Sequence, residues 1–457
     1  MRPEVPLRGA WRQHRDLLAN AGSLIATTGV TSGLGFAYWA LAARLLPQAE
    51  VGYGSAAVSA MTLLGTIGMF GLGTVLIGEL PRRSPRAGLI SAALLAAGAG
   101  ALVLGLGFVL IAPALSARFA AIAGSPAQAA LFTAGVVVTA VSMVFDLATI
   151  GLLRGGLQLG RNIAFSAVKL AALPAAVIIL HAGFGASIIV SWVAGTALSL
   201  IPVAIRLALA GQPLAPRPDW RVLRGLGRTA LAHNWLNLAI TVPLSLIPVL
   251  VTVVVSPAAN AAFYAAWMLS SFLFIVPVHL STALFAVAAG DQQALAGKLR
   301  TSLRLSLLAG IPGTAVLALA AHPLLSLFGA GYARAATVPL WLLLAGYLPA
   351  LPKTYYVAVC RATGRISRAA ALLTAFAAAQ IAAAVLGGLA GGLIGVSAGL
   401  LAVAVIEGLA TAPAVLRAAR APAAPGPAVA PVPDRTPRVS RLPDPDRAQP
   451  QLARASA

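Results

Sequence analysis

Long apolar stretches alternate with short polar segments along almost the whole chain. Each stretch holds roughly 20 mostly apolar residues, the length that a helix needs to cross a lipid bilayer. Strict alternation of apolar and polar residues, which would indicate the strands of a membrane barrel, is absent from them. The pattern predicts an all-α polytopic membrane protein with twelve transmembrane helices. Their expected ranges are 17–45, 51–78, 87–113, 127–151, 162–182, 185–209, 228–255, 259–289, 302–328, 336–359, 366–389 and 392–415.

The composition agrees with this interpretation and excludes several other classes of protein. Of the 457 residues, 59% are hydrophobic and only 9% are charged, and the mean hydropathy is +0.90. A chain this apolar is unable to cover a water-facing surface with polar groups. The single cysteine, Cys360, excludes an internal disulfide framework and a cysteine-based metal site.

Positive charge is in excess, with 32 Lys and Arg residues against 11 Asp and Glu residues and a net charge of +21. In a soluble protein this excess would indicate nucleic-acid binding. Here all but five of the 32 basic residues fall on one side of the membrane, in the terminal segments and in the loops after even-numbered spans. The positive-inside rule therefore predicts two cytoplasmic termini in the plasma (inner) membrane. We expect contacts with anionic lipids at the cytoplasmic face and no nucleic-acid partner.

Similar sequence signals recur about 210 residues apart. Pro47 precedes the second span and Pro257 precedes the eighth, while Gly185 and Gly395 open the sixth and twelfth spans. A repeat of six helices predicts two pseudo-symmetric lobes that bracket a central path. The expected units are a basic N-terminal segment (1–16), a first lobe (17–209), an Arg-rich linker (210–227), a second lobe (228–418) and a disordered Pro/Ala/Arg-rich tail (419–457).

Motifs for catalysis or for nucleotide hydrolysis are missing from the sequence. The chain has no Gly-x-x-x-x-Gly-Lys-Ser/Thr loop, its five histidines lack the spacing of metal ligands, and no Ser/His/Asp constellation stands out. The loop from Gly78 to Arg86 also differs from the motif of the major facilitator class, because arginine replaces its acidic residue. We therefore expect a transporter rather than an enzyme, without a cofactor or a metal.

Four charged residues fall well inside the predicted spans, away from their ends, namely Asp146, Lys169, Lys353 and Glu407. At 1.5 Å per residue each lies about 12 Å from the same end of its helix, so the four share one layer. A charge near the bilayer centre costs about 2.5–3.5 kcal/mol and needs a partner or a wet cavity. Two arrangements stay open: Asp146 with Lys169 and Lys353 with Glu407 as ion pairs within each lobe, or Asp146 with Lys353 as a gate between the lobes.

Small residues and prolines mark two of the spans. Gly65, Gly68 and Gly71 are three residues apart on the second span and indicate a close-packing face rather than a hinge. Pro349 and Pro352 are expected to bend the tenth span.

Several short segments resemble those of polysaccharide-export flippases. They are Ala43-Arg44-Leu45-Leu46-Pro47, Glu50-Val51-Gly52-Tyr53-Gly54, Phe70-Gly71-Leu72-Gly73-Thr74, His233-Asn234, Leu246-Ile247-Pro248 and Ala262-Phe263-Tyr264-Ala265-Ala266-Trp267. Such proteins belong to the multidrug/oligosaccharidyl-lipid/polysaccharide (MOP) exporter superfamily, and the resemblance covers roughly residues 15–418. It implies a two-lobed carrier of twelve helices. By alternating access, it would flip a polyprenyl-pyrophosphate-linked glycan for cell-surface lipopolysaccharide or exopolysaccharide biosynthesis.

The same resemblance implies a positively lined cavity and partners that make or polymerise the glycan. Lys169 and Lys353, together with Arg44, are the candidates for binding the anionic head group. His233 and Asn237 lie four residues apart on the seventh span, where they would line the cavity or form hydrogen bonds between helices. Glycosyltransferases and glycan polymerases are the expected protein partners.

Three other functions stay open. A cation-coupled multidrug exporter of the same superfamily would rely on a buried carboxylate in the first lobe, where Asp146 is the available acid. A lipid II flippase usually carries several arginines within its spans, which this chain lacks. A membrane-embedded glycan polymerase or transferase generally has large charged outer loops, whereas the outer loops here are short and nearly uncharged.

Overall fold

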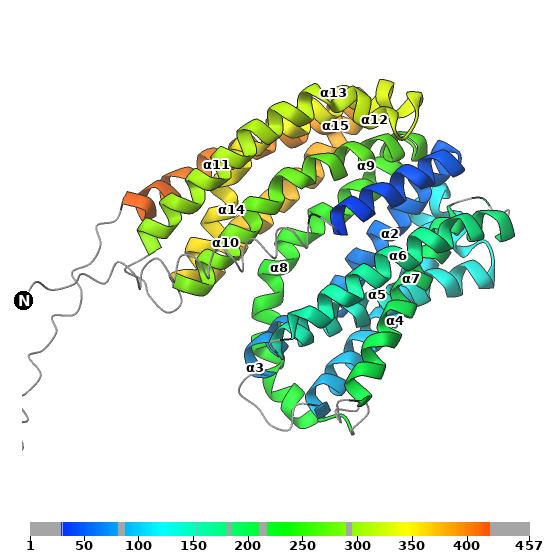
Figure 1. Cartoon of the computed structure of the whole chain (residues 1–457), viewed down its shortest axis with the longest axis horizontal. Helices are drawn as coiled ribbons and strands as arrows, with labels where there is room; N and C mark the ends of the chain where they lie inside the picture. Colours follow the sequence, from blue (N-terminus) through cyan, green and yellow to red (C-terminus); the bar gives the residue numbers. More distant parts are fainter. Residues whose placement is uncertain are drawn as a thin grey trace, which may run out of the picture. The chain divides into compact units, whose positions relative to one another are not determined.

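The computed structural model describes residues 29, 31–80, 87–152, 154–180, 183, 185–209, 217–288 and 295–420. These residues are almost entirely helical (Figure 1). Their contacts belong to one compact unit, Met1–Ala421. A second unit, Pro422–Ala457, lies outside the described residues, as does the predicted N-terminal segment 1–16.

The helices follow the order of the predicted spans. The first half contains a helix over 31–45, α2 (Gln48–Gly68), α3 (Leu72–Glu79), α4 (Ala87–Leu115), η2 (Ala117–Ala123), α5 (Pro126–Gly151), α6 (Gly155–Leu180) and α7 (Ala186–Leu209). The second half contains α8 (Trp220–Val254), α9 (Pro257–Ser271), η3 (Phe272–Phe274), α10 (Ile275–Ala288), α11 (Leu295–Leu319), α12 (Ala321–Ser326), α13 (Ala330–Ala345), α14 (Tyr347–Ala362) and α15 (Ile366–Arg420).

The distribution of apolar side chains is that of a protein surrounded by lipid. Within the described residues, nine helices are long and apolar enough to cross a membrane, and the bent pair α13–α14 forms a tenth candidate. Leu110 and Leu319 on the outer helices are 80% and 86% exposed, whereas Asn260 and Glu407 are completely buried. Polar groups inside and aliphatic groups outside are what a hydrocarbon solvent requires. The chain is therefore a multi-pass membrane protein.

The second predicted span is broken where a hinge was not expected. Phe70 and Gly71 adopt left-handed backbone conformations, with φ of 49° and 72°, and separate α2 from α3. Gly65 and Gly68 do form a close-packing face, because a Cβ at Gly68 would lie 2.8 Å from the backbone nitrogen of Ala101. The prediction of no hinge was therefore wrong at Gly71, where the helix breaks and the positive φ favours glycine.

The tenth span bends one turn earlier than its prolines suggested. The helices α13 and α14 meet at an angle of 49° around Gly346, while Pro349 and Pro352 lie within α14. A proline clashes with the carbonyl of the residue four positions earlier, which for Pro349 is Ala345 at the end of α13. The helix therefore breaks where that carbonyl loses its donor.

The long helix α15 contains two segments that fold back on each other. Gly391 and Gly392 leave the helical region, the latter with a φ of 57°. A Cβ at Gly387 would lie 2.2 Å from the carbonyl oxygen of Gly395, and one at Gly399 would lie 2.9 Å from that of Ala383. Two glycines thus allow the two segments to pack backbone to backbone.

The two halves of the chain meet where the repeated segments begin. In Figure 1, α2 lies beside α5 in the first half and beside α8 and α9 in the second, as their contacts confirm. Gly52 near the start of α2 packs on the start of α9, and a Cβ there would lie 1.7 Å from the carbonyl oxygen of Pro257. Glycine is required because two backbones approach each other closely at this point.

Candidate functional site

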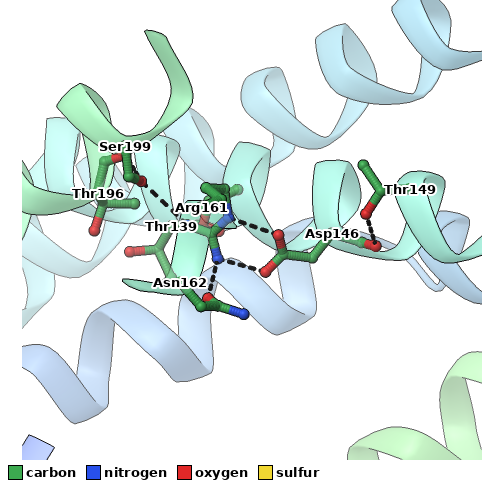
Figure 2. Close-up of polar contacts among 8 residues, drawn as sticks. Thr139, Asp146, Thr149, Arg161, Asn162, Thr196 and Ser199 are labelled. Atoms are coloured by element: carbon green, nitrogen blue, oxygen red, sulfur yellow. Dashed lines mark hydrogen bonds and ion pairs between the residues drawn. The ribbon is translucent and has the colours of Figure 1, made fainter. Parts of the chain in front are cut away.

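A buried ion pair joins α5 to α6, next to α7. Figure 2 shows Asp146 facing Arg161, with Nε 2.6 Å from Oδ1 and one terminal nitrogen 2.5 Å from Oδ2. The guanidinium also donates to Ser199 Oγ at 3.3 Å and to Asn162 Oδ1 at 2.7 Å. The side chains of Arg161 and Asp146 are 6% and 16% exposed. This two-point contact is the strongest geometry available to an arginine and a carboxylate.

The partner of Asp146 corrects one predicted pairing. Asp146 was expected to pair with Lys169 or Lys353, and Arg161 was assigned to a loop, because the fifth span was taken to begin at residue 162. The helix α6 begins earlier, at Gly155, so Arg161 lies within it. Asp146 and Arg161 are nearly equidistant from the turn between α5 and α6, and the two helices of a hairpin bring such positions together. These near-equal distances are the feature of the sequence from which the pairing of Asp146 with Arg161 could have been predicted.

A second buried ion pair joins α14 to α15. Lys353 Nζ lies 2.6 Å from Glu407 Oε2, and the two side chains are 25% and 1% exposed. Gln380, also on α15, donates a hydrogen bond to the other carboxylate oxygen. The structure thus contains the pairing of Lys353 with Glu407 within one half. Lys353 and Asp146 each have another partner here, so the predicted gate contact between them is not formed.

Lys169 on α6 is a buried cation enclosed by aromatic rings. Its side chain is 4% exposed, and Nζ lies 4.3 Å from the ring centre of Trp192, 4.4 Å from that of Phe165 and 4.9 Å from that of Tyr38. No carboxylate among the described residues lies within 4.0 Å of Nζ. Cation–π contacts of this kind are worth about 2 kcal/mol or more when desolvated, but they leave the net charge in place.

The aromatic surroundings of Lys169 extend into the second half of the chain. The rings of Trp39 and Trp192 are 6.1 Å apart, and that of Trp39 lies 4.8 Å from Tyr264 on α9. Trp192 and Tyr264 are only partly buried. Lys169 is therefore linked to the second half by a chain of aromatic rings in contact.

Hydrogen bonds between repeat-equivalent segments join α2 to α9. Gln48 Nε2 donates to the carbonyl oxygen of Ala258 at 3.0 Å, and these residues are 210 positions apart. Asn260 Nδ2 donates to the carbonyl oxygen of Gly52 and to Ser55 Oγ, both at 3.0 Å. We call these five residues the repeat junction. Asn260 Oδ1 is buried and has no partner in the described structure.

Two further cavity candidates are Arg44 and His233, and Arg44 has a structural role. Arg44 donates from Nε to the carbonyl oxygen of Leu327 at 2.8 Å and from a terminal nitrogen to that of Ser326 at 2.9 Å. These carbonyls end α12, so Arg44 caps a helix of the opposite half. The side chain of His233 lies outside the described residues.

Asn237 forms a polar bridge between the halves at their arginine-rich end. Its Nδ2 donates to Thr74 Oγ1 on α3 at 2.9 Å, and its Oδ1 accepts from Arg361 on α14 at 3.2 Å. Of the two alternatives for Asn237, the structure shows the hydrogen bond between helices. Arg361 is half-buried and was counted only as a topology marker in the sequence. The polar bridge is the set Thr74, Asn237 and Arg361.

Comparisons with known proteins bear on both the sequence and the fold. Residues 17–212 match the model of a family described as polysaccharide biosynthesis protein. No curated protein matches the chain. A multidrug-resistance MATE transporter of the MOP superfamily, in its inward-facing conformation, is 14% identical with a TM-score of 0.63, covering 85% of this chain and 94% of its own.

Two further solved structures share the arrangement of helices. A MOP superfamily transporter from Pyrococcus furiosus is 13% identical, with a TM-score of 0.56 over 89% of this chain and 96% of its own. A variant of a MATE transporter from Vibrio cholerae is 16% identical, with a TM-score of 0.55 over 88% and 94%. The chain has the fold of the MOP transporters. The fold that the resemblance of the sequence implied is therefore confirmed.

On this fold, each half holds a carboxylate that is paired with a cation. Asp146 in the first half is held by Arg161, and Glu407 in the second half is held by Lys353. Lys169 remains as the buried ionic group of the described residues that has no ionic partner. The interior of the first half thus carries a net positive charge.

Proposed function

We propose that this MOP-type transporter is a flippase for a polyprenyl-pyrophosphate-linked oligosaccharide or polysaccharide precursor. It moves its substrate across the plasma membrane by alternating access, and it serves cell-surface polysaccharide biosynthesis. The observation that carries the proposal is the uncompensated charge of Lys169 in the first half, since a buried cation without a counter-ion suits an anionic substrate. The family match over residues 17–212 supports the same biology.

The pairing of Asp146 argues against the cation-coupled multidrug exporter. That alternative relies on a buried carboxylate of the first lobe that is free to bind a cation. Asp146 instead accepts two short hydrogen bonds from Arg161, which neutralises it. An exporter of cationic drugs would also have to bring its substrate near Lys169, and like charges in a low dielectric repel each other strongly.

The membrane arrangement belongs to the same proposal. We infer twelve spans in two six-helix lobes (17–209 and 228–418) joined by the linker 210–227, with both termini and the tail 419–457 in the cytoplasm. The two segments of α15, the broken spans α2–α3 and α13–α14, and the helix over 31–45 support this count. The clustering of arginines at one end supports the orientation. Anionic lipids at that face and glycan-assembling enzymes are the proposed partners.

Deleting the gene and measuring lipid-linked glycans tests the proposal. We expect glycans on the polyprenyl carrier to accumulate in the inner leaflet, since synthesis continues while flipping stops. Wild-type protein supplied from a plasmid should reverse the accumulation. Unchanged glycan pools together with new sensitivity to cationic dyes would instead establish the multidrug exporter.

Lys169→Met separates substrate binding from a structural role. Methionine is about as long as lysine and fills the same space among the rings. The substitution also removes a buried charge, and a charge near the bilayer centre costs about 2.5–3.5 kcal/mol. We therefore expect full expression and undiminished thermal stability, with loss of flipping. Arg334→Gln, which removes an exposed arginine of α13, is the matched control and should flip normally. A destabilised but active Lys169→Met variant would refute the binding role.

A further inference from the structure

The polar bridge contains an arginine whose hydrogen-bonding capacity is largely unused. A guanidinium has five N–H donors. Arg361 uses one of its terminal nitrogens for a 3.2 Å contact with the neutral amide oxygen of Asn237. No carboxylate of the described chain lies within 4.0 Å of it. Arg361 is thus a half-buried cation with a weak, uncharged partner.

Arg161 has more hydrogen-bond partners than Arg361, and one of them is charged. Arg161 has two short contacts with Asp146 and further contacts with Ser199 and Asn162. A hydrogen bond between a charged donor and a charged acceptor is roughly twice as strong as one between neutral groups. A phosphate oxygen would therefore outcompete the amide of Asn237 for Arg361, whereas it would have to break an ion pair at Arg161.

The bridge also joins the two halves of the chain. Thr74 belongs to α3 in the first half, whereas Asn237 and Arg361 belong to α8 and α14 in the second. Arg361 lies in the last turn of α14, and the arginines that follow it, Arg365 and Arg368, are exposed. An anion attracted to this arginine-rich end would meet Arg361 as the innermost guanidinium of the group.

We propose that Arg361 receives the diphosphate of the lipid-linked substrate and that this contact releases Asn237, which loosens the link between the halves. The inference rests on the proposed function, because it takes the substrate to be a polyprenyl diphosphate. The diphosphate replaces a neutral amide with a charged, two-point partner, so the free energy of the new contact favours opening. A lipid without the diphosphate leaves the bridge intact.

Binding of geranyl diphosphate, a short soluble polyprenyl diphosphate, tests the first step. The full chain is reconstituted in nanodiscs and titrated by calorimetry, with geraniol as the uncharged control ligand. We expect Arg361→Gln to weaken the binding of geranyl diphosphate at least about tenfold, since one charge-assisted contact is lost. The affinity of Arg361→Lys for geranyl diphosphate should lie between those of the wild type and Arg361→Gln, because lysine keeps the charge but loses the two-point geometry of the guanidinium. Arg334→Gln, which removes an exposed arginine of α13, should bind like the wild type.

Variants of Asn237 test the competition without touching the arginine. In Asn237→Asp, a carboxylate occupies the position of the amide and holds Arg361 in an ion pair, so geranyl diphosphate should bind more weakly. In Asn237→Ala the competitor is removed, and binding should be at least as tight as in the wild type. A merely structural bridge would make both variants equally unstable and would leave binding to the folded fraction unchanged.

Release of the halves is measured by the distance between spin labels at the arginine-rich end. Gly78→Cys and Thr363→Cys provide exposed labelling positions on the two halves in a Cys360→Ala background. Geranyl diphosphate should lengthen this distance in the otherwise wild-type chain, and the added Asn237→Asp substitution should abolish the change.

The outcomes distinguish failure of this inference from failure of the proposed function. If the wild-type chain binds geranyl diphosphate and flips glycans, but Arg361→Gln binds equally well, Arg361 is not the receptor and the inference is overturned alone. If geranyl diphosphate does not change the distance between the labels, the release step is overturned while the proposed function stands. If the wild-type chain fails to bind geranyl diphosphate and glycan pools are unchanged on deletion, both proposals are overturned.

Discussion

The ion pair between Asp146 and Arg161 allows a quantitative test of the fold. In Asp146→Asn the guanidinium of Arg161, only 6% exposed, loses its counter-charge but keeps its contacts with Asn162 and Ser199. Breaking a buried pair from one side costs about 3–5 kcal/mol. The two surviving contacts place the expected loss of unfolding free energy near the lower end, at about 3 kcal/mol.

Removing both charges together should cost much less than removing one. In Asp146→Asn/Arg161→Gln no charge is left uncompensated, and replacement of buried pairs by neutral groups is often close to neutral. We expect the double variant to lie within about 1 kcal/mol of the wild type, so that the single losses are non-additive by at least about 2 kcal/mol.

The assay is the free energy of unfolding of the full chain in mixed micelles, from titration with SDS followed by tryptophan fluorescence. Arg334→Gln removes an exposed charge and should change the unfolding free energy by no more than about 0.5 kcal/mol. The reasoning fails if Asp146→Asn is as stable as the wild type, or if the losses of the two single variants simply add in the double variant.

Three further predictions follow from contacts of the described residues. Lys353→Met leaves the buried carboxylate of Glu407 unpaired and should lower the unfolding free energy by about 3–5 kcal/mol, whereas Lys353→Met/Glu407→Gln should recover most of the loss in the same titration. Gly52→Ala places a Cβ 1.7 Å from the carbonyl oxygen of Pro257, so it should lower the thermal midpoint measured by fluorescence-detected size exclusion. Gly71→Ala forces a side chain into a φ of 72° and should cost about 1–2 kcal/mol.

Matched controls separate these effects from the general consequences of substitution. Gly107 lies in α4 with open space around its missing Cβ, so Gly107→Ala should be neutral or stabilising by about 0.5–1 kcal/mol. Equal losses for Gly52→Ala and Gly107→Ala would contradict the close approach of the halves. For the ion pair of α14 and α15, a double variant as unstable as Lys353→Met would show that the charge of Glu407 is not the cause.

The alternative gate between Asp146 and Lys353 is open to a direct experiment on transport. Charge reversal at both positions should fail to restore the activity lost in either single variant, because the partners in the structure are Arg161 and Glu407. Rescue by the double reversal, measured through the lipid-linked glycan pool, would establish that the two residues meet in another conformation.

Sequence reasoning reached the location of the ionic groups more closely than their partners. The spacing of Asp146, Lys353 and Glu407 along their spans predicts a common layer, because helix rise converts residue number into depth. The ion pairs show that Asp146, Lys353 and Glu407 are in fact held by ionic partners. The spacing did not give the neighbours, since the direction in which a side chain points depends on helix rotation and on which helices are adjacent. Arg161 was missed because an error of seven residues in a helix boundary moved it out of the membrane.

What the sequence alone determines here is the environment of the chain. The bilayer constrains the hydropathy, length and flanking arginines of each segment separately. Local composition is therefore sufficient to predict that the chain lies in a membrane. Tertiary structure decided which charges are neutralised. Lys169 stands without a counter-ion, and Arg361 reaches Asn237, because packing between distant segments placed aromatic rings around one and a neutral amide beside the other. Such packing depends on shape complementarity between helices, so it cannot be predicted from any single stretch of residues.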